Sequence, residues 1–194
     1  MKLVAVSQRI DIYQNVGEVR DGLDQRLTAF LYAAGALSVP VPNFLADDKI
    51  AWLKAISPDA IVLSGGNTPG TRSDRDATDE FLLDYAYRES LPVLGICRGM
   101  QSIGLWAGCD LIEVAEHVRT RHSISGELHG QVNSYHNFAL ETCPPDFNHM
   151  AYSGAGVIEA IKHKNLKWEG WMWHPEREQT FSRLDIARLG ALIQ

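Results

Sequence analysis

A cysteine between glycines stands where an apolar run meets a helix-forming run, in the segment Gly95-Ile96-Cys97-Arg98-Gly99. Residues 91–96 have the length and composition of a short buried strand, and residues 100–107 carry apolar side chains at helical spacing. Small residues on both sides of a strand-to-helix turn tolerate a sharp, strained backbone that leaves the central side chain accessible. The segment therefore predicts an α/β fold with Cys97 at the carboxyl end of a strand.

This position also suits a cysteine nucleophile. A thiol in the first turn of a helix lies near the positive end of the helix dipole and near unpaired N–H groups, which favour the thiolate. The backbone N–H of Arg98 would then stabilise an oxyanion formed by attack of Cys97. A buried cysteine with no chemical role is the alternative that the pentapeptide alone leaves open.

A second polar cluster follows the aromatic run Gly170-Trp171-Met172-Trp173. His174 and Glu176 are two positions apart, so in an extended chain both side chains point the same way. His174 can present one ring nitrogen to Cys97 while Glu176 orients the other, as nucleophilic acyl transfer requires. Together, the two clusters favour catalysis over a polar strand end.

Strands alternate with helices of ten or more residues over the first half of the chain, which indicates a parallel sheet covered on both faces. We expect one domain over residues 1–194, a flavodoxin-like three-layer sandwich with a mostly parallel central sheet and a small antiparallel extension. The expected strands are 3–7, 37–41, 60–63, 91–96, 110–114, 130–135, 150–153 and 156–161, and the expected helices are 21–34, 48–55, 76–90, 100–107 and 180–192.

Taken together, these motifs resemble the class I glutamine amidotransferase superfamily. The resemblance rests on Cys97 in GICRGMQ, on His174 and Glu176 in WHPE, and on Ser64-Gly65-Gly66-Asn67 after a strand. It implies that Cys97 is the nucleophile, His174 the general base and acid, and Glu176 the orienting carboxylate. It further implies that backbone amides of Gly66 and Arg98 form the oxyanion hole and that Gln101 holds the γ-glutamyl group.

Within the superfamily, Arg98 and the pair Arg75-Asp76 are similar to the γ-glutamyl hydrolase branch, peptidase family C26. So is the segment Val132 to His136, although Asn137 stands where those hydrolases commonly have a second histidine. This similarity implies substrate contacts by Arg75, Asn133, Ser134, Tyr135 and His136. The opening Val6-Ser7-Gln8-Arg9 resembles hydrolases encoded with bacterial surface-polysaccharide genes, some of which cleave a γ-glutamyl group from a nucleotide-linked phosphoramidate.

Charge and cysteine content narrow the partners. The formal net charge of −6 argues against nucleic-acid or anionic-membrane binding, which requires basic patches. Local arginines can still bind a nucleotide diphosphate; the candidates are Arg9, Arg72, Arg75, Arg119 and Arg121. Three cysteines without C-x-x-C spacing, no signal-peptide core and no apolar run of about 20 residues predict a cytoplasmic protein.

The remaining histidines do not form a helical metal-binding pattern. His117 and His122 fall in a region that we expect to be a loop over the site, and polar loop residues are the favoured interpretation. His136 belongs to the predicted substrate pocket through its motif. We therefore expect neither a metal nor a cofactor.

Three functions remain open. The leading hypothesis is hydrolysis of a small-molecule γ-glutamyl amide, through a Cys97 thioester, with release of glutamate and an amine or amidate. The second is a glutaminase subunit that delivers ammonia to a partner synthase; homo-oligomerisation is equally open. The third is a non-catalytic scaffold, against which the intact set of Cys97, His174 and Glu176 argues.

Overall fold

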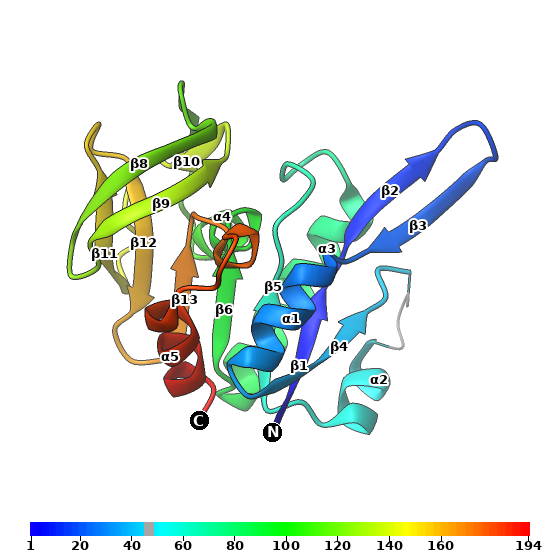
Figure 1. The fold of residues 1–194 in the computed structure, drawn as a ribbon. Helices are drawn as coiled ribbons and strands as arrows, with labels where there is room; N and C mark the ends of the chain where they lie inside the picture. Colours follow the sequence, from blue (N-terminus) through cyan, green and yellow to red (C-terminus); the bar gives the residue numbers. More distant parts are fainter. Residues whose placement is uncertain (45–48) are drawn as a thin grey trace.

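One central sheet organises the chain (Figure 1). The computed structural model describes residues 1–44 and 49–194, and the sheet has two halves within them. The parallel half contains β1 (Lys2–Ser7), β4 (Ala36–Val41), β5 (Ala60–Leu63), β6 (Val93–Ile96) and β13 (Trp168–Trp171). The antiparallel half contains β8 (Val118–Gly126), β9 (Gly130–Tyr135), β11 (Phe147–Ser153) and β12 (Ile158–His163).

The strand order is β4-β1-β5-β6-β13-β12-β11-β8-β9. The first five strands are parallel and have the order of a flavodoxin-like sheet. From β13 onward the pairing is antiparallel. This topology confirms the predicted single-domain α/β fold, with a larger antiparallel half than expected.

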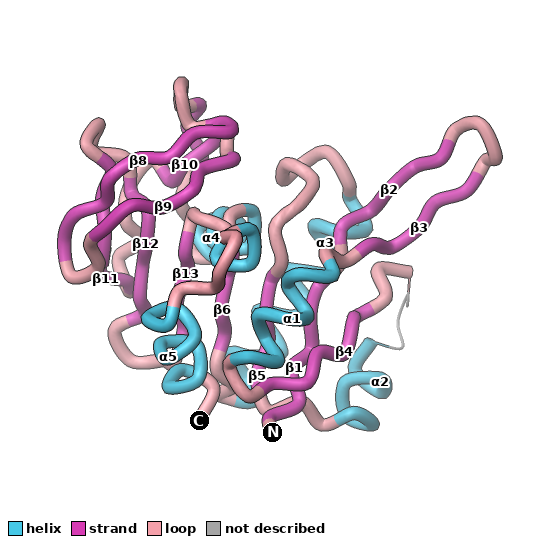
Figure 2. Tube along the Cα trace, viewed as in Figure 1, coloured by secondary structure: helices cyan, strands magenta, loops and turns pink. Residues whose placement is uncertain are grey.

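Helices cover both faces of the parallel half (Figure 2). They are α1 (Gln25–Ala33), α2 (Lys49–Ile56), α3 (Ser73–Glu89), α4 (Arg98–Trp106) and α5 (Arg183–Leu192). Successive residues of β1 point to opposite faces: Val4 and Val6 share a core with Phe30 of α1, whereas Ala5 lies in the core that contains Leu83 of α3. The sheet is therefore the middle layer of three.

Residues 9–22 differ from the prediction. They form a hairpin of β2 (Arg9–Tyr13) and β3 (Glu18–Gly22), which Figure 1 shows projecting from the body of the protein. The expected helix from Asp21 begins only at α1, because the Asp24 side chain accepts a hydrogen bond from the Arg26 backbone N–H and caps it. This hairpin supplies part of the site described below.

Other boundaries shift by smaller amounts. Residues 118–126, which we expected to be a loop, form β8, whose mostly exposed polar side chains gave little strand signal. The short strands β7 (Leu111–Glu113) and β10 (Phe138–Leu140) pair outside the main sheet. Ser182 caps α5, two residues after the predicted start, and the expected helix at 48–55 corresponds to α2, with Asp48 outside the described residues. In the described ranges, every helix is too short or too polar to span a membrane.

A buried ionic network fixes the start of α4 against α3. The guanidinium of Arg98 contacts Asp79 and donates to Asp76 Oδ1 at 2.6 Å, and Asp79 also accepts from Arg75 at 3.2 Å. Burial lowers the pKa of Arg75 to about 9 and that of Arg98 to about 10. Both guanidinium groups therefore keep their charge at neutral pH and need Asp79 as their counter-ion.

Asp79→Ala should lower the free energy of unfolding by about 3–5 kcal/mol, because it leaves two buried guanidinium groups without their shared carboxylate. Urea denaturation followed by circular dichroism measures this change. The control is Glu80→Ala on the exposed face of the same helix, for which we expect a change within about 0.5 kcal/mol. Equal effects of the two variants would show that the network does not stabilise the fold.

Candidate active site

Cys97 occupies a strained turn between β6 and α4. Its backbone has φ 51° and ψ −104°, a conformation that non-glycine residues rarely adopt. The turn is tight because Gly99 packs so closely on Leu63 that a Cβ there would collide with the Leu63 carbonyl. The Cys97 backbone N–H donates to Trp171 O at 2.7 Å, which ties the turn to β13.

His174 lies at the carboxyl end of the neighbouring strand β13, beside Cys97. Its Nδ1 is 2.6 Å from Glu176 Oε1, and both side chains are buried. Burial lowers the pKa of His174, but hydrogen bonds to Cys97 and Glu176 outweigh burial and raise that pKa to about 9. His174 is therefore protonated at neutral pH, which places an imidazolium next to the thiol.

Asn133 of β9 holds the backbone of His174. Its Nδ2 donates to His174 O at 2.8 Å, and its Oδ1 accepts from His174 N at 2.9 Å. The ring of Tyr135, also on β9, meets the imidazole edge to face at 5.6 Å. The antiparallel half of the sheet thus positions a residue that the parallel half carries.

The loop after β5 lies on the other side of the imidazole. A Cβ on Gly65 would lie 2.5 Å from His174 Cε1, so only glycine fits there. Gly66 has φ +142° and packs against Arg9. Arg98 opens α4, where the first N–H groups of a helix have no partner within the helix. Gly66 and the Arg98 amide therefore stay candidates for the oxyanion hole.

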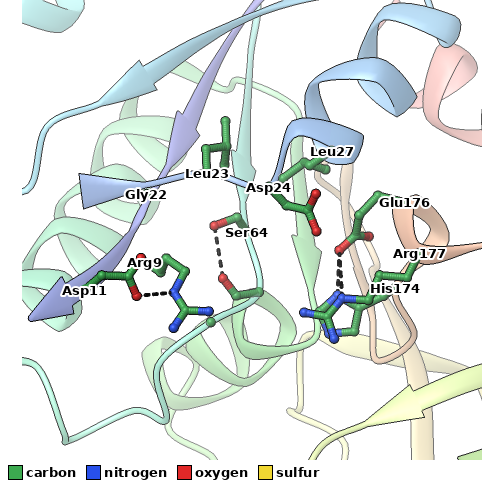
Figure 3. Close-up of a pocket in the computed structure, with 12 residues that line it drawn as sticks. Arg9, Asp11, Gly22, Leu23, Asp24, Leu27, Ser64, His174, Glu176 and Arg177 are labelled. Atoms are coloured by element: carbon green, nitrogen blue, oxygen red, sulfur yellow. Dashed lines mark hydrogen bonds and ion pairs between the residues drawn. The ribbon is translucent and has the colours of Figure 1, made fainter. Parts of the chain in front are cut away.

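A cavity of about 260 Å³ opens beside this cluster (Figure 3). Figure 3 shows His174 and Glu176 on one side and Arg9 with Asp11 on the other; Arg9 Nε donates to Asp11 Oδ1 at 2.8 Å. Cys97 is 7% exposed and does not line the cavity, which borders the loop and imidazole side of the cluster. The lining residues are Arg9, Asp11, Gly22, Leu23, Asp24, Leu27, Ser64, Gly65, Gly66, His174, Glu176 and Arg177.

Several predicted substrate residues have structural contacts instead. Arg75 is fully buried and donates to Ser64 O at 2.9 Å, so it supports the loop and does not reach the cavity, contrary to the predicted contact. Gln101 Nε2 donates to Phe138 O at 2.8 Å, and Ser134 Oγ donates to His117 O at 2.6 Å. His136 is buried in a cluster with His117 and Glu159.

Sequence analysis missed the contribution of the hairpin and of Arg177. Asp11, Gly22 and Asp24 line the cavity because β2 and β3 fold over it. The guanidinium carbon of Arg177 lies 4.5 Å from the centre of the Tyr135 ring, which orients this side chain at the cavity wall. Its place directly after Glu176 was the one available signal.

The chain matches the family model described as glutamine amidotransferase class-I over residues 16–192. A γ-glutamyl-CDP-amidate hydrolase from Campylobacter jejuni is 32% identical over 135 residues, which cover 66% of this chain and 68% of that protein. Anthranilate synthase component 2 from Pseudomonas putida is 33% identical over 160 residues, covering 73% and 79%, and the glutamine-hydrolysing GMP synthase subunit from Pyrococcus furiosus is 31% identical over 163 residues, covering 79% and 83%.

Solved structures agree on the fold. The crystal structure of a putative GMP synthase subunit from Thermoplasma acidophilum superposes with a TM-score of 0.76 at 22% identity, covering 100% of this chain and 94% of that one. The fold and the cysteine elbow thus define an α/β enzyme of the amidotransferase type. The chain belongs to the class I glutamine amidotransferase family and is an amidohydrolase of that family.

Gly65→Ala should lower kcat by about 100-fold or more, because the added methyl group displaces the imidazole, and misplacement by about 1 Å costs that much. Steady-state glutaminase or amidase kinetics measure the effect. The control is Gly154→Ala, where a Cβ meets nothing within 4 Å. Wild-type kcat in Gly65→Ala would show that the observed imidazole position is not required for turnover.

Proposed function

We propose that the protein hydrolyses a γ-glutamyl amide through a Cys97–His174–Glu176 triad. The observation that carries this proposal is the buried contact set in which His174 interacts with Cys97 on one side and with Glu176 on the other. This is the nucleophile, base and orienting carboxylate that covalent acyl transfer uses. The family assignment supports it independently.

In the first half of the reaction, the Cys97 thiolate attacks the γ-carbonyl carbon. The resulting oxyanion binds the backbone amides of Gly66 and Arg98, and the C–N bond breaks as His174 gives its proton to the departing nitrogen. In the second half, His174 accepts a proton from water, whose oxygen attacks the γ-glutamyl thioester. The C–S bond breaks, glutamate leaves, and the thiolate–imidazolium pair is restored.

The leaving group that we propose is phosphorylated, as in a nucleotide-linked phosphoramidate. Arg9 and Arg177 both line the cavity, and guanidinium groups bind phosphate oxygens with directed, charge-assisted hydrogen bonds. The relative named for γ-glutamyl-CDP-amidate hydrolysis supports the same class of substrate.

A glutaminase subunit is the second candidate, because two relatives of comparable identity are named as synthase components. The two functions share the first half-reaction and differ in the fate of nitrogen. Purified protein incubated with glutamine, γ-glutamyl-polyamines and a γ-glutamyl nucleotide amidate distinguishes them. We expect glutamate release from the amidate by the protein alone; release from glutamine only when a synthase is added would favour the second candidate.

Arg9→Gln should lower kcat/KM for the nucleotide amidate by about 10- to 100-fold, the value of one charge-assisted hydrogen bond, and leave glutamine hydrolysis nearly unchanged. Parallel assays of the two substrates measure this selectivity. Arg20→Gln serves as the control, since Arg20 is exposed on the same hairpin and outside the cavity. An equal loss on both substrates would contradict phosphate recognition by Arg9 and leave the triad proposal untouched.

The pH dependence follows from the raised pKa of His174. Since the imidazolium must protonate the leaving nitrogen, kcat/KM should fall as the pH rises through about 9. Glu176→Gln removes a carboxylate that raises this pKa, so the fall should begin at lower pH. Profiles of kcat/KM against pH measure the shift, with Glu141→Gln, on the exposed surface, as the control. An unmoved alkaline limb in Glu176→Gln would separate Glu176 from His174.

A further inference from the structure

Three histidines converge on one buried glutamate in the antiparallel half of the sheet. His117 directly precedes β8, His122 lies on β8, His136 follows β9, and Glu159 lies on β12. The proposed hydrolytic mechanism uses none of these four side chains. Each comes from a different position in the chain, so the fold alone brings them together.

The distances between their ligand atoms are those of a small coordination sphere. His117 Nδ1 is 3.2 Å from His136 Nε2 and 3.4 Å from Glu159 Oε1, and His136 Nε2 is 3.5 Å from the same oxygen. His122 Nε2 lies 3.3 Å from that oxygen as well. Ligands held at about 2.0–2.1 Å from a tetrahedral ion are about 3.3–3.4 Å apart, so three of these atoms already outline one face.

The carboxylate at the centre lacks hydrogen-bond donors. Glu159 is fully buried, and among residues 1–44 and 49–194 neither of its oxygens has a hydrogen-bond partner. The facing nitrogen of His122 is without a partner in the same part of the chain. An unpaired buried carboxylate costs several kcal/mol, which a bound cation offsets.

His136 is held in the tautomer that a metal requires. Its Nδ1 is 3.1 Å from Phe138 O, an acceptor, so the ring proton sits on Nδ1 and the Nε2 lone pair faces the cluster. A ligating histidine whose other nitrogen donates to a backbone carbonyl is the usual outer support of a zinc site. Backbone contacts also fix His117, because its carbonyl accepts from both His136 N at 3.2 Å and Ser134 Oγ at 2.6 Å.

We propose that His117, His136 and Glu159, together with His122, form a structural site for a divalent transition metal ion, with Zn²⁺ as the ion that their chemistry favours. Imidazole and carboxylate ligands in a small tetrahedral site suit Zn²⁺ over Ca²⁺ or Mg²⁺, which prefer six or more oxygens. Four protein ligands fill the coordination sphere, so the ion has no open position for catalysis. The site joins β8 and β9 to β12.

This ion would also stiffen the neighbourhood of His174. The Glu159 backbone carbonyl accepts from Met172 N at 2.8 Å, two residues before His174, and Phe138 O accepts from both His136 and Gln101. The metal site is separate from hydrolysis and does not depend on the proposed substrate. Its test therefore uses metal binding as the readout.

The full chain carrying Cys97→Ala should first be stripped with a chelator, so that zinc bound to the reactive thiol does not count. Titration with ZnCl₂ against a chromophoric competitor should then show one tight site per chain, and X-ray absorption should show nitrogen and oxygen scatterers at about 2.0–2.1 Å. Saturation should raise the melting temperature, since the ion binds the folded chain. Absence of a stoichiometric site overturns the proposal and leaves a metal-free histidine–carboxylate cluster.

The variants His136→Ala and Glu159→Gln should each weaken Zn²⁺ binding by at least about 100-fold, because loss of even an outer partner costs about 10- to 100-fold. His149→Ala, an exposed histidine on β11, is the matched control and should bind as the parent does. If the two buried variants fail to fold, His122→Ala replaces them, since that side chain is 19% exposed. Unchanged affinity together with an unchanged Co²⁺ absorption spectrum in His122→Ala would exclude this cluster.

Discussion

The backbone strain at Cys97 is the constraint on which the rest of the site depends. A non-glycine residue in that conformation costs about 1–3 kcal/mol, so the surrounding structure must enforce it. Three contacts do so: the hydrogen bond from Cys97 N to Trp171 O, the packing of Gly99 on Leu63, and the pairing of Arg98 with Asp79. They come from β13, β5 and α3, so the elbow exists only once the whole parallel half has assembled.

The same sheet sets the spacing between the thiol and the imidazole. Trp171 pairs with Ile96 in the register of β13 and β6, so the chain leaves both strands at one edge. Cys97 follows directly on one strand, and His174 follows three residues later on the other. Parallel neighbours therefore bring together two groups that lie far apart in sequence, as carboxyl ends of such strands do generally.

How far sequence predicts this molecule depends on how strongly each segment is buried. The parallel strands and the Cys97, His174 and Glu176 motifs were predictable, because apolar runs and elbow glycines leave a clear pattern. The β2–β3 hairpin and β8 were missed because their side chains are mostly exposed and polar, and nothing in the sequence alternates cleanly. The role of Asn133 was also out of reach: a motif indicates that an amide is near the site, but only pairing of distant strands shows that it binds the His174 backbone.

The antiparallel half is therefore part of the active-site framework. His174 sits in the loop after β13, and without Asn133 its backbone N–H and C=O would be buried and unpaired. Asn133 in turn lies on β9, whose position relative to β12 depends on β8 and β11 between them. An edge strand reached through three antiparallel pairings is free to flex, and a cluster that links His136 beyond β9 directly to Glu159 on β12 bypasses two of those pairings. The buried glutamate thus lies where a single bound ion would most restrict the strand that orients the general base.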